Sequence, residues 1–135
     1  MLWAQTQKPS DSPACPGTTV DNQGANVAKL SRAFLAQLQT AVHEGDKTKV
    51  ASMASYPLLV IHGGRKTRIK TKAEFLAKYD TIFDAHVQKA IAQQSARCLF
   101  GNYQGAMIGD GELWFAQQQD GVMKIITVNS SAGSQ

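Results

Sequence analysis

Residues 56–79 read YPLLVIHGGRKTRIKTKAEFLAKY, and this stretch contains a strand, a tight turn, a second strand and the start of a helix. The run 56–62 is rich in residues that favour strands. The two glycines that follow permit the positive φ angles of a hairpin turn, and the alternation in 66–70 predicts the returning strand. We expect Pro57 at the start of its strand or on an edge of the sheet, because proline donates no backbone hydrogen bond.

A capping box follows the second strand. Thr71 precedes Glu74 by three residues, so that each side chain can satisfy a backbone donor, and we expect a helix to begin at Lys72. Thr81 is a candidate break in this helix. The apolar spacing predicts a buried helical face that consists of Phe75, Leu76, Tyr79, Ile82, Phe83, His86, Val87, Ala90 and Ile91.

A longer helix is expected before the hairpin, over residues 27–42, because apolar residues recur there at spacings of three and four. Asn26 can cap its start and Gly45 can close its end. Asp46 then offers the cap of a second, short helix.

The last third of the chain changes to strand periodicity. The strands that we expect there lie at residues 103–108, 112–118 and 122–129. Glycine and aspartate at 109–111 and 120–121 supply the turns between them. The predicted fold class is therefore α+β, with helices packed on a curved antiparallel sheet.

The totals are those of a single globular domain. Of 135 residues, 43% are hydrophobic and 18% are charged, which is an ordinary balance for a folded protein. Residues 1–24 hold three of the four prolines and little apolar surface, so we expect a flexible tail there. We expect one domain over 25–130 and a disordered end at 131–135. No apolar run approaches the ~20 residues of a membrane-spanning helix, so no membrane span is expected.

Basic residues concentrate between Arg65 and Lys72 in a chain whose net charge is +4. That strand lacks aromatic side chains that could stack on bases, so nucleic acid is not an expected partner. Lysines also protect an edge strand against unwanted pairing. An acidic protein surface or an anionic lipid headgroup remains compatible with this charge.

Two cysteines, Cys15 and Cys98, lie far apart and form no CxxC motif, so no metal site and no cofactor is expected. A disulfide between them remains open, and it would be typical of a protein outside the reducing cytosol. The opening residues 1–5 are similar to the end of a trimmed secretion signal. We expect an exported or periplasmic protein; the alternative is a cytoplasmic protein with two free thiols.

The order of elements resembles the nuclear transport factor two-like superfamily, which includes ketosteroid isomerase, scytalone dehydratase and polyketide cyclases. The likeness covers about residues 27–129, and its local features are AVHEGD at 41–46, YPL at 56–58, EFLAKYD at 74–80 and GELWF at 111–115. The resemblance implies a cone-shaped fold with a pocket between a concave sheet and the helices. It also implies a homodimer through the outer face of the sheet. The superfamily contains enzymes, ligand binders and docking domains, so the fold alone specifies no reaction.

The resemblance places His62 where isomerase-type members keep their general base; the alternative is a solvated histidine beside the hairpin turn. It places Leu38 where those members keep a hydrogen-bonding tyrosine, so the steroid-isomerase mechanism is not implied. Asp110 and Glu112 flank Gly111 and could act as paired carboxylates; the alternative is a solvated turn.

The residues that we expect to bind a ligand are Leu38, Tyr56, Tyr79, Phe83, His86, Tyr103 and Trp114. For His86 the alternative is a hydrogen-bonded core histidine, and for Trp114 it is a dimer contact. The chain has no GxSxG elbow, phosphate loop or dinucleotide glycine pattern. We therefore expect a non-catalytic domain that binds a small apolar or amphipathic ligand, or a partner protein. One alternative is an isomerase, dehydratase or cyclase-like enzyme with His62 as its base and Asp110, Glu112 or Tyr103 as assistants. The other is an interaction domain whose cone is filled.

Overall fold

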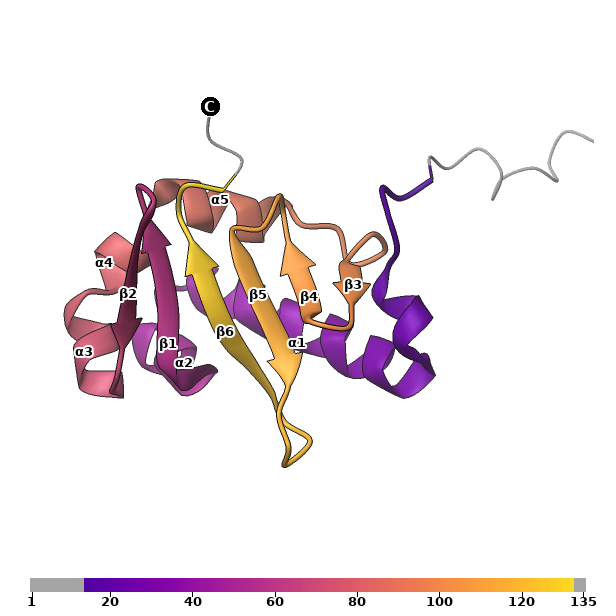
Figure 1. Cartoon of the computed structure of the whole chain (residues 1–135), viewed down its shortest axis with the longest axis horizontal. Helices are drawn as coiled ribbons and strands as arrows, with labels where there is room; N and C mark the ends of the chain where they lie inside the picture. The colour runs from indigo at the N-terminus through magenta and orange to yellow at the C-terminus, as the bar shows by residue number, and fades with distance from the viewer. Residues whose placement is uncertain (1–13, 133–135) are drawn as a thin grey trace, which may run out of the picture.

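The computed structural model describes residues 14–132, in which helices cover one face of a six-stranded sheet (Figure 1). The strands are β1 (Ala54–His62), β2 (Arg65–Ile69), β3 (Phe100–Asn102), β4 (Gly105–Ile108), β5 (Leu113–Gln117) and β6 (Met123–Asn129). The helices are η3 (Val20–Gln23), α1 (Ala25–His43), α2 (Lys47–Ser52), α3 (Lys72–Ala77), α4 (Tyr79–Ile82) and α5 (Ala85–Gln93). The predicted α+β class is confirmed.

The sheet is open and mixed, with strand order β2-β1-β6-β5-β4-β3. β1 and β6 run parallel, whereas the other neighbouring pairs run antiparallel. The predicted antiparallel sheet is therefore corrected to a mixed one. The reason is topological: the meander starts at the β3 edge, and its last strand reaches β1 while running in the same direction. β2 and β3 form the two edges.

Local signals specify α1 and the turn after it. The N–H groups of Gly45 and Asp46 donate to the carbonyls of Val42 and Ala41, which is the Schellman pattern, and Gly45 has a φ of 69°. Asp46 then caps α2 by accepting a hydrogen bond from the Lys49 amide. The predicted Asn26 cap is wrong, since α1 begins one residue before it with Gly24 at the N-cap.

The segment predicted as one helix from Lys72 to Ile91 forms three helices. The Thr71 half of the capping box is present, because the Glu74 amide donates to Thr71 Oγ1 at 3.1 Å, whereas the Glu74 carboxylate accepts from the Lys70 amide at 2.9 Å. The breaks lie at Lys78 and after Phe83, rather than at Thr81, and Asp84 starts α5 by accepting from the Val87 amide. These changes of direction leave Leu76 38% exposed, so the prediction that it is buried is wrong.

Pro57 lies inside β1, which is an internal strand, so the predicted edge or first position is wrong. Pairing with β2 begins only at Leu58, and the register with β6 shifts between Ala54 and Leu59. The proline therefore occupies an irregular part of the ladder, where a missing N–H is tolerated.

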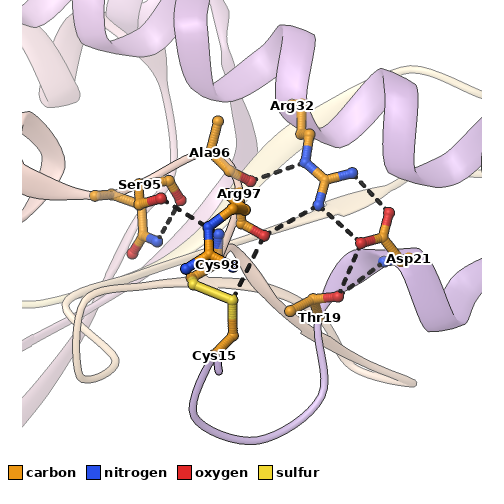
Figure 2. Close-up of a disulfide and its surroundings, with 9 residues drawn as sticks. Cys15, Thr19, Asp21, Arg32, Ser95, Ala96, Arg97 and Cys98 are labelled. Carbon is orange, nitrogen blue, oxygen red and sulfur yellow. Dashed lines mark hydrogen bonds and ion pairs between the residues drawn. A yellow bond between two sulfur atoms is a disulfide. The ribbon is translucent and has the colours of Figure 1, made fainter. Parts of the chain in front are cut away.

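The amino-terminal segment lies along the β3 edge (Figures 1 and 2). Cys15 and Cys98 form a disulfide across 83 residues, Thr19 forms a β-bridge with Phe100, and Val20 is buried. We call residues 15–23 the strap. They belong to the range expected as a tail, whereas residues 1–13 and 133–135 lie outside the described residues.

Candidate functional site

A groove of about 570 Å³ lies between the β1–β2 hairpin and helices α3 and α4, and we call it the hairpin groove. This volume is within the usual range for a small-molecule site. The Gly63–Gly64 turn builds one end of it, because both glycines adopt positive φ angles and set His62 opposite Arg65. The alternation of side chains along both strands then decides which residues face the groove.

The groove changes from cationic to apolar with distance from the turn. On the face of the hairpin that lines the groove, His62 pairs with Arg65 and Val60 pairs with Thr67. Ile69, farther from the turn, is the last residue of β2 in the lining. His62 and Arg65 are exposed, while Val60 and Ile69 are buried. The helices contribute Lys78, Thr81 and Ile82 to the lining. The groove therefore combines an apolar floor with a polar, basic rim.

His62 is held by a residue distant in sequence. Its Nδ1 lies 2.6 Å from Oγ of Ser130, which follows β6 and is buried. The contact fixes the imidazole ring and leaves Nε2 as the ring nitrogen available to a ligand in the groove.

The charge of Lys78 is partly neutralised by Glu74, which lies one turn earlier in α3. Its Nζ lies 3.2 Å from Glu74 Oε2, and the other oxygen of that carboxylate accepts from the Lys70 amide. The hydrogen bond from the Lys70 amide has the larger effect on the pKa of Glu74, and the one from Lys78 the smaller. Both lower this pKa, so the carboxylate is ionised at neutral pH. Arg65 takes part in none of the ion pairs found among residues 14–132.

Three of the residues predicted to bind a ligand lie in the core. Leu38, Tyr79 and Phe83 are buried, and the Tyr79 ring stacks on Phe83 with centroids 5.2 Å apart. Burial raises the pKa of Tyr79. None of five hollows on the described part of the chain is lined by these three side chains.

The remaining aromatic candidates point to other parts of the molecule. Tyr56 is half-buried, and its hydroxyl donates to the Ala51 carbonyl at 2.7 Å. Tyr103 lies in the β3–β4 turn, where it is 95% exposed. Trp114 is half-buried and packs edge-on against Phe100. The structure does not bring these three side chains together around one cavity.

His86 and Glu112 form a second polar cluster, just before the start of β5. His86 Nε2 lies 2.9 Å from Glu112 Oε2 and 2.7 Å from the Ala132 carbonyl. Because two acceptors face this nitrogen, Nε2 carries the proton. The Ala132 carbonyl, and after it the Glu112 charge, raise the pKa of His86.

Asp110 and Glu112 do not form a pair of carboxylates; instead, the backbone amide of Asp110 binds the side chain of Glu112. Glu112 is 4% exposed, and its Oε1 accepts from the Asp110 amide at 2.6 Å, whereas the Asp110 side chain lies in an exposed turn. Both oxygens of Glu112 therefore have partners that belong to the turn and to α5. Glu112 therefore links the turn before β5 to α5.

The proposed catalytic set is not assembled around His62. The side-chain partner of His62 is a hydroxyl, the carboxylate of Glu112 is bound to His86, and Tyr103 lies in a different turn. A general base needs its partners within hydrogen-bond reach of the reacting group. The arrangement is suited to binding polar and apolar groups side by side.

The sequence interpretation missed Arg65, Lys78 and Ser130 as neighbours of His62. The two-residue turn carried the signal for Arg65, because it sets the residues before and after it opposite one another. The strand period of two would also have separated Arg65 from Lys66 and Arg68. No local signal relates Ser130 to His62, which lies 68 residues away.

The uncovered face of the sheet carries a row of side chains that continues from strand to strand. The register places Arg68, Leu59, Thr127, Trp114, Met107 and Phe100 opposite one another in this order. The helices lie behind the sheet in Figure 1, so this face has no covering layer in the described chain.

Within residues 14–132, no group of three or more His, Cys, Asp or Glu side chains could hold a metal ion. The helices of the same region lack the length and apolar character needed to cross a membrane. Comparisons of the chain with family models, curated proteins and solved structures find no match.

Proposed function

We propose that this protein is a non-catalytic binding domain that holds a small amphipathic ligand in the hairpin groove. The observation that carries the proposal is the apolar floor of Val60, Ile69 and Ile82 beside a polar rim. Small-molecule sites commonly combine an apolar lining with a few convergent polar groups. The order of elements also supports membership of the nuclear transport factor two-like superfamily.

Among residues 14–132, the side-chain partner of His62 is a hydroxyl and not a carboxylate, which favours binding over the isomerase-type alternative. The hydroxyl of Ser130 orients the ring but supplies no charge that would stabilise a protonated base. An enzyme of that type would also need hydrogen-bond donors for a developing oxyanion. A turnover lost in His62→Ala, with binding retained, would overturn the non-catalytic part of the proposal.

Titration with 1-octanol, followed by methyl NMR, tests the site. We expect saturable shifts at the methyl groups of Val60, Ile69 and Ile82. Thr67→Trp fills the groove and should abolish them, whereas Lys66→Trp places the same ring on the opposite face of β2 and should not. Saturable shifts that persist in Thr67→Trp, or that map to another surface, would reject the groove as the site.

We also propose that the protein forms a homodimer through the uncovered sheet face. The row that contains Leu59, Trp114, Met107 and Phe100 supplies half-buried apolar side chains in neighbouring strands. Sedimentation equilibrium should give twice the chain mass, and Trp114→Lys should give a folded monomer. A monomeric wild-type protein at high concentration would reject the dimer.

The disulfide supports export, because such bonds persist in oxidising compartments and are rare in the cytosol. Fractionation of the producing cell tests this proposal. We expect oxidised protein in the periplasmic or extracellular fraction, and reduced protein in the cytosol would contradict it.

A further inference from the structure

We propose that the ligand of the hairpin groove is a small amphipathic carboxylate, whose anionic head lies at the Gly63–Gly64 end. This inference rests on the proposed function, because it names the chemical class of the ligand for the same site. Three observations support this inference: the charge of the rim, the position of that charge relative to the apolar floor, and the lack of acidic side chains in the lining.

Positive charge reaches the groove from two elements: Arg65 lies at the start of β2, and Lys78 is the residue after α3. His62, at the end of β1, adds a polar ring to the same rim. The lining contains neither aspartate nor glutamate. The local potential therefore favours an anion even where the overall charge of the chain is screened by salt.

Arg65 is the principal anchor in this proposal. Lys78 already contacts Glu74, whereas Arg65 is absent from the ion pairs found in the described part of the chain. A guanidinium presents two parallel N–H groups that match the two oxygens of a carboxylate. His62 lies directly opposite Arg65 in the same cross-strand pair.

The polarity gradient gives the ligand an orientation. From the turn inward, the lining changes from His62 and Arg65, through Val60 and Thr67, to Ile69. An apolar chain that extends from the head therefore meets the apolar side chains of Val60, Ile69 and Ile82. A ligand with several charges, such as a nucleic acid, would place charge on this apolar floor and fits it less well.

Calorimetry with three probes of equal chain length tests the inference: octanoate, 1-octanol and octylammonium, each in the monomeric range. We expect octanoate to bind about tenfold more tightly than 1-octanol, because a charge-assisted hydrogen bond is stronger than a neutral one, and we expect octylammonium to bind most weakly. Arg65→Gln should reduce the octanoate affinity to that of 1-octanol. Lys66→Gln removes the same charge from the other face of β2 and should leave the affinity unchanged.

The outcomes separate the two proposals. Equal affinity for octanoate and 1-octanol would overturn the inference while leaving the proposed function standing. Equal losses in Arg65→Gln and Lys66→Gln would also overturn it, since the net charge of the chain and not the groove would then attract the anion. If none of the three probes binds, the proposed function fails, and the inference fails with it.

Discussion

The two edges of the sheet are protected in different ways. At the β3 edge, the strap runs beside the strand: the Val20 amide donates to Leu99, and the Gly101 amide donates to Thr18. At the β2 edge the backbone is open, and the side chains of Lys66 and Arg68 are exposed. An unpaired edge can template association with another chain, and covering it or charging it are two known solutions.

The difference shows which parts of the molecule depend on distant sequence. The covered edge needs a covalent connection between Cys15 and Cys98, as well as the Arg32 guanidinium that joins the strap to α1 and the 96–97 loop (Figure 2). The open edge needs only the residues of β2 itself. The open edge also leaves the hairpin groove accessible from one side.

The largest effect expected is that of removing the disulfide. Cys15→Ser with Cys98→Ser frees a loop of 83 residues in the unfolded chain, and loop entropy predicts a loss of roughly 4 kcal/mol in the free energy of unfolding. Urea unfolding at pH 7 measures it. Wild-type protein treated with reductant should unfold at the same urea concentration as the variant, and an unchanged midpoint would contradict the proposed role of the strap.

Gly101→Ala tests the fit of the strap against β3. A Cβ at this position would lie 2.9 Å from the Cα of Val20 and 2.8 Å from Oε1 of Gln23, so the strap must shift. We expect a loss of about 1–3 kcal/mol, the usual range for overpacking.

The disulfide variant supplies the control for Gly101→Ala. In the Cys15→Ser, Cys98→Ser background, the strap is free to move, so the same alanine should cost clearly less than in the wild type. Equal losses in both backgrounds would mean that the strain lies within β3 and not against the strap.

Lys66→Val with Arg68→Val tests the open edge. We expect the free energy of unfolding to change by less than about 0.5 kcal/mol, because both side chains are exposed. We expect self-association to increase, because the edge becomes apolar and loses its charge. Light scattering against concentration measures this. Lys29→Ala with Lys89→Ala removes the same charge from α1 and α5, and association in this control would point to net charge alone.

Several local features were predicted correctly from the sequence. The Gly63–Gly64 turn, the Thr71 cap and the Gly45 helix end each depend on residues within a few positions, and the structure confirms them, although the local predictions of the Asn26 cap and the Thr81 break were wrong. The helical stripe of α1 is also local, since its period alone selects the buried face. These signals are enough to define the α+β class.

Features that depend on distant pairings could not be predicted. The parallel contact between β1 and β6 and the burial of Val20 both require knowledge of which segments meet. The same holds for the candidate site. The sequence singled out His62, but its partner Ser130 is 68 residues away. The groove also depends on the breaks between helices at Lys78 and Phe83, which the sequence did not predict. An alternation pattern specifies a face without specifying its neighbour.

The smallest effect concerns the ion pair that joins the strap to α1. Arg32 donates to both oxygens of Asp21 at 2.7 and 3.1 Å, and this hydrogen bonding lowers the pKa of Asp21. A carboxylate whose pKa is lower in the folded state stabilises the fold above its unfolded pKa. That stabilisation is lost as the pH falls through the folded pKa.

The thermal midpoint of the wild type should therefore exceed that of Asp21→Asn slightly at pH 6, and the difference should disappear in strong acid. Other carboxylates titrate in both proteins and cancel in the comparison. Glu44→Gln is the matched control, because Glu44 is exposed and takes part in none of the ion pairs in residues 14–132, and its difference should not vary with pH. If the Asp21 difference is the same at all pH values, the ion pair does not hold the strap, and the disulfide and backbone bonds alone cover the β3 edge.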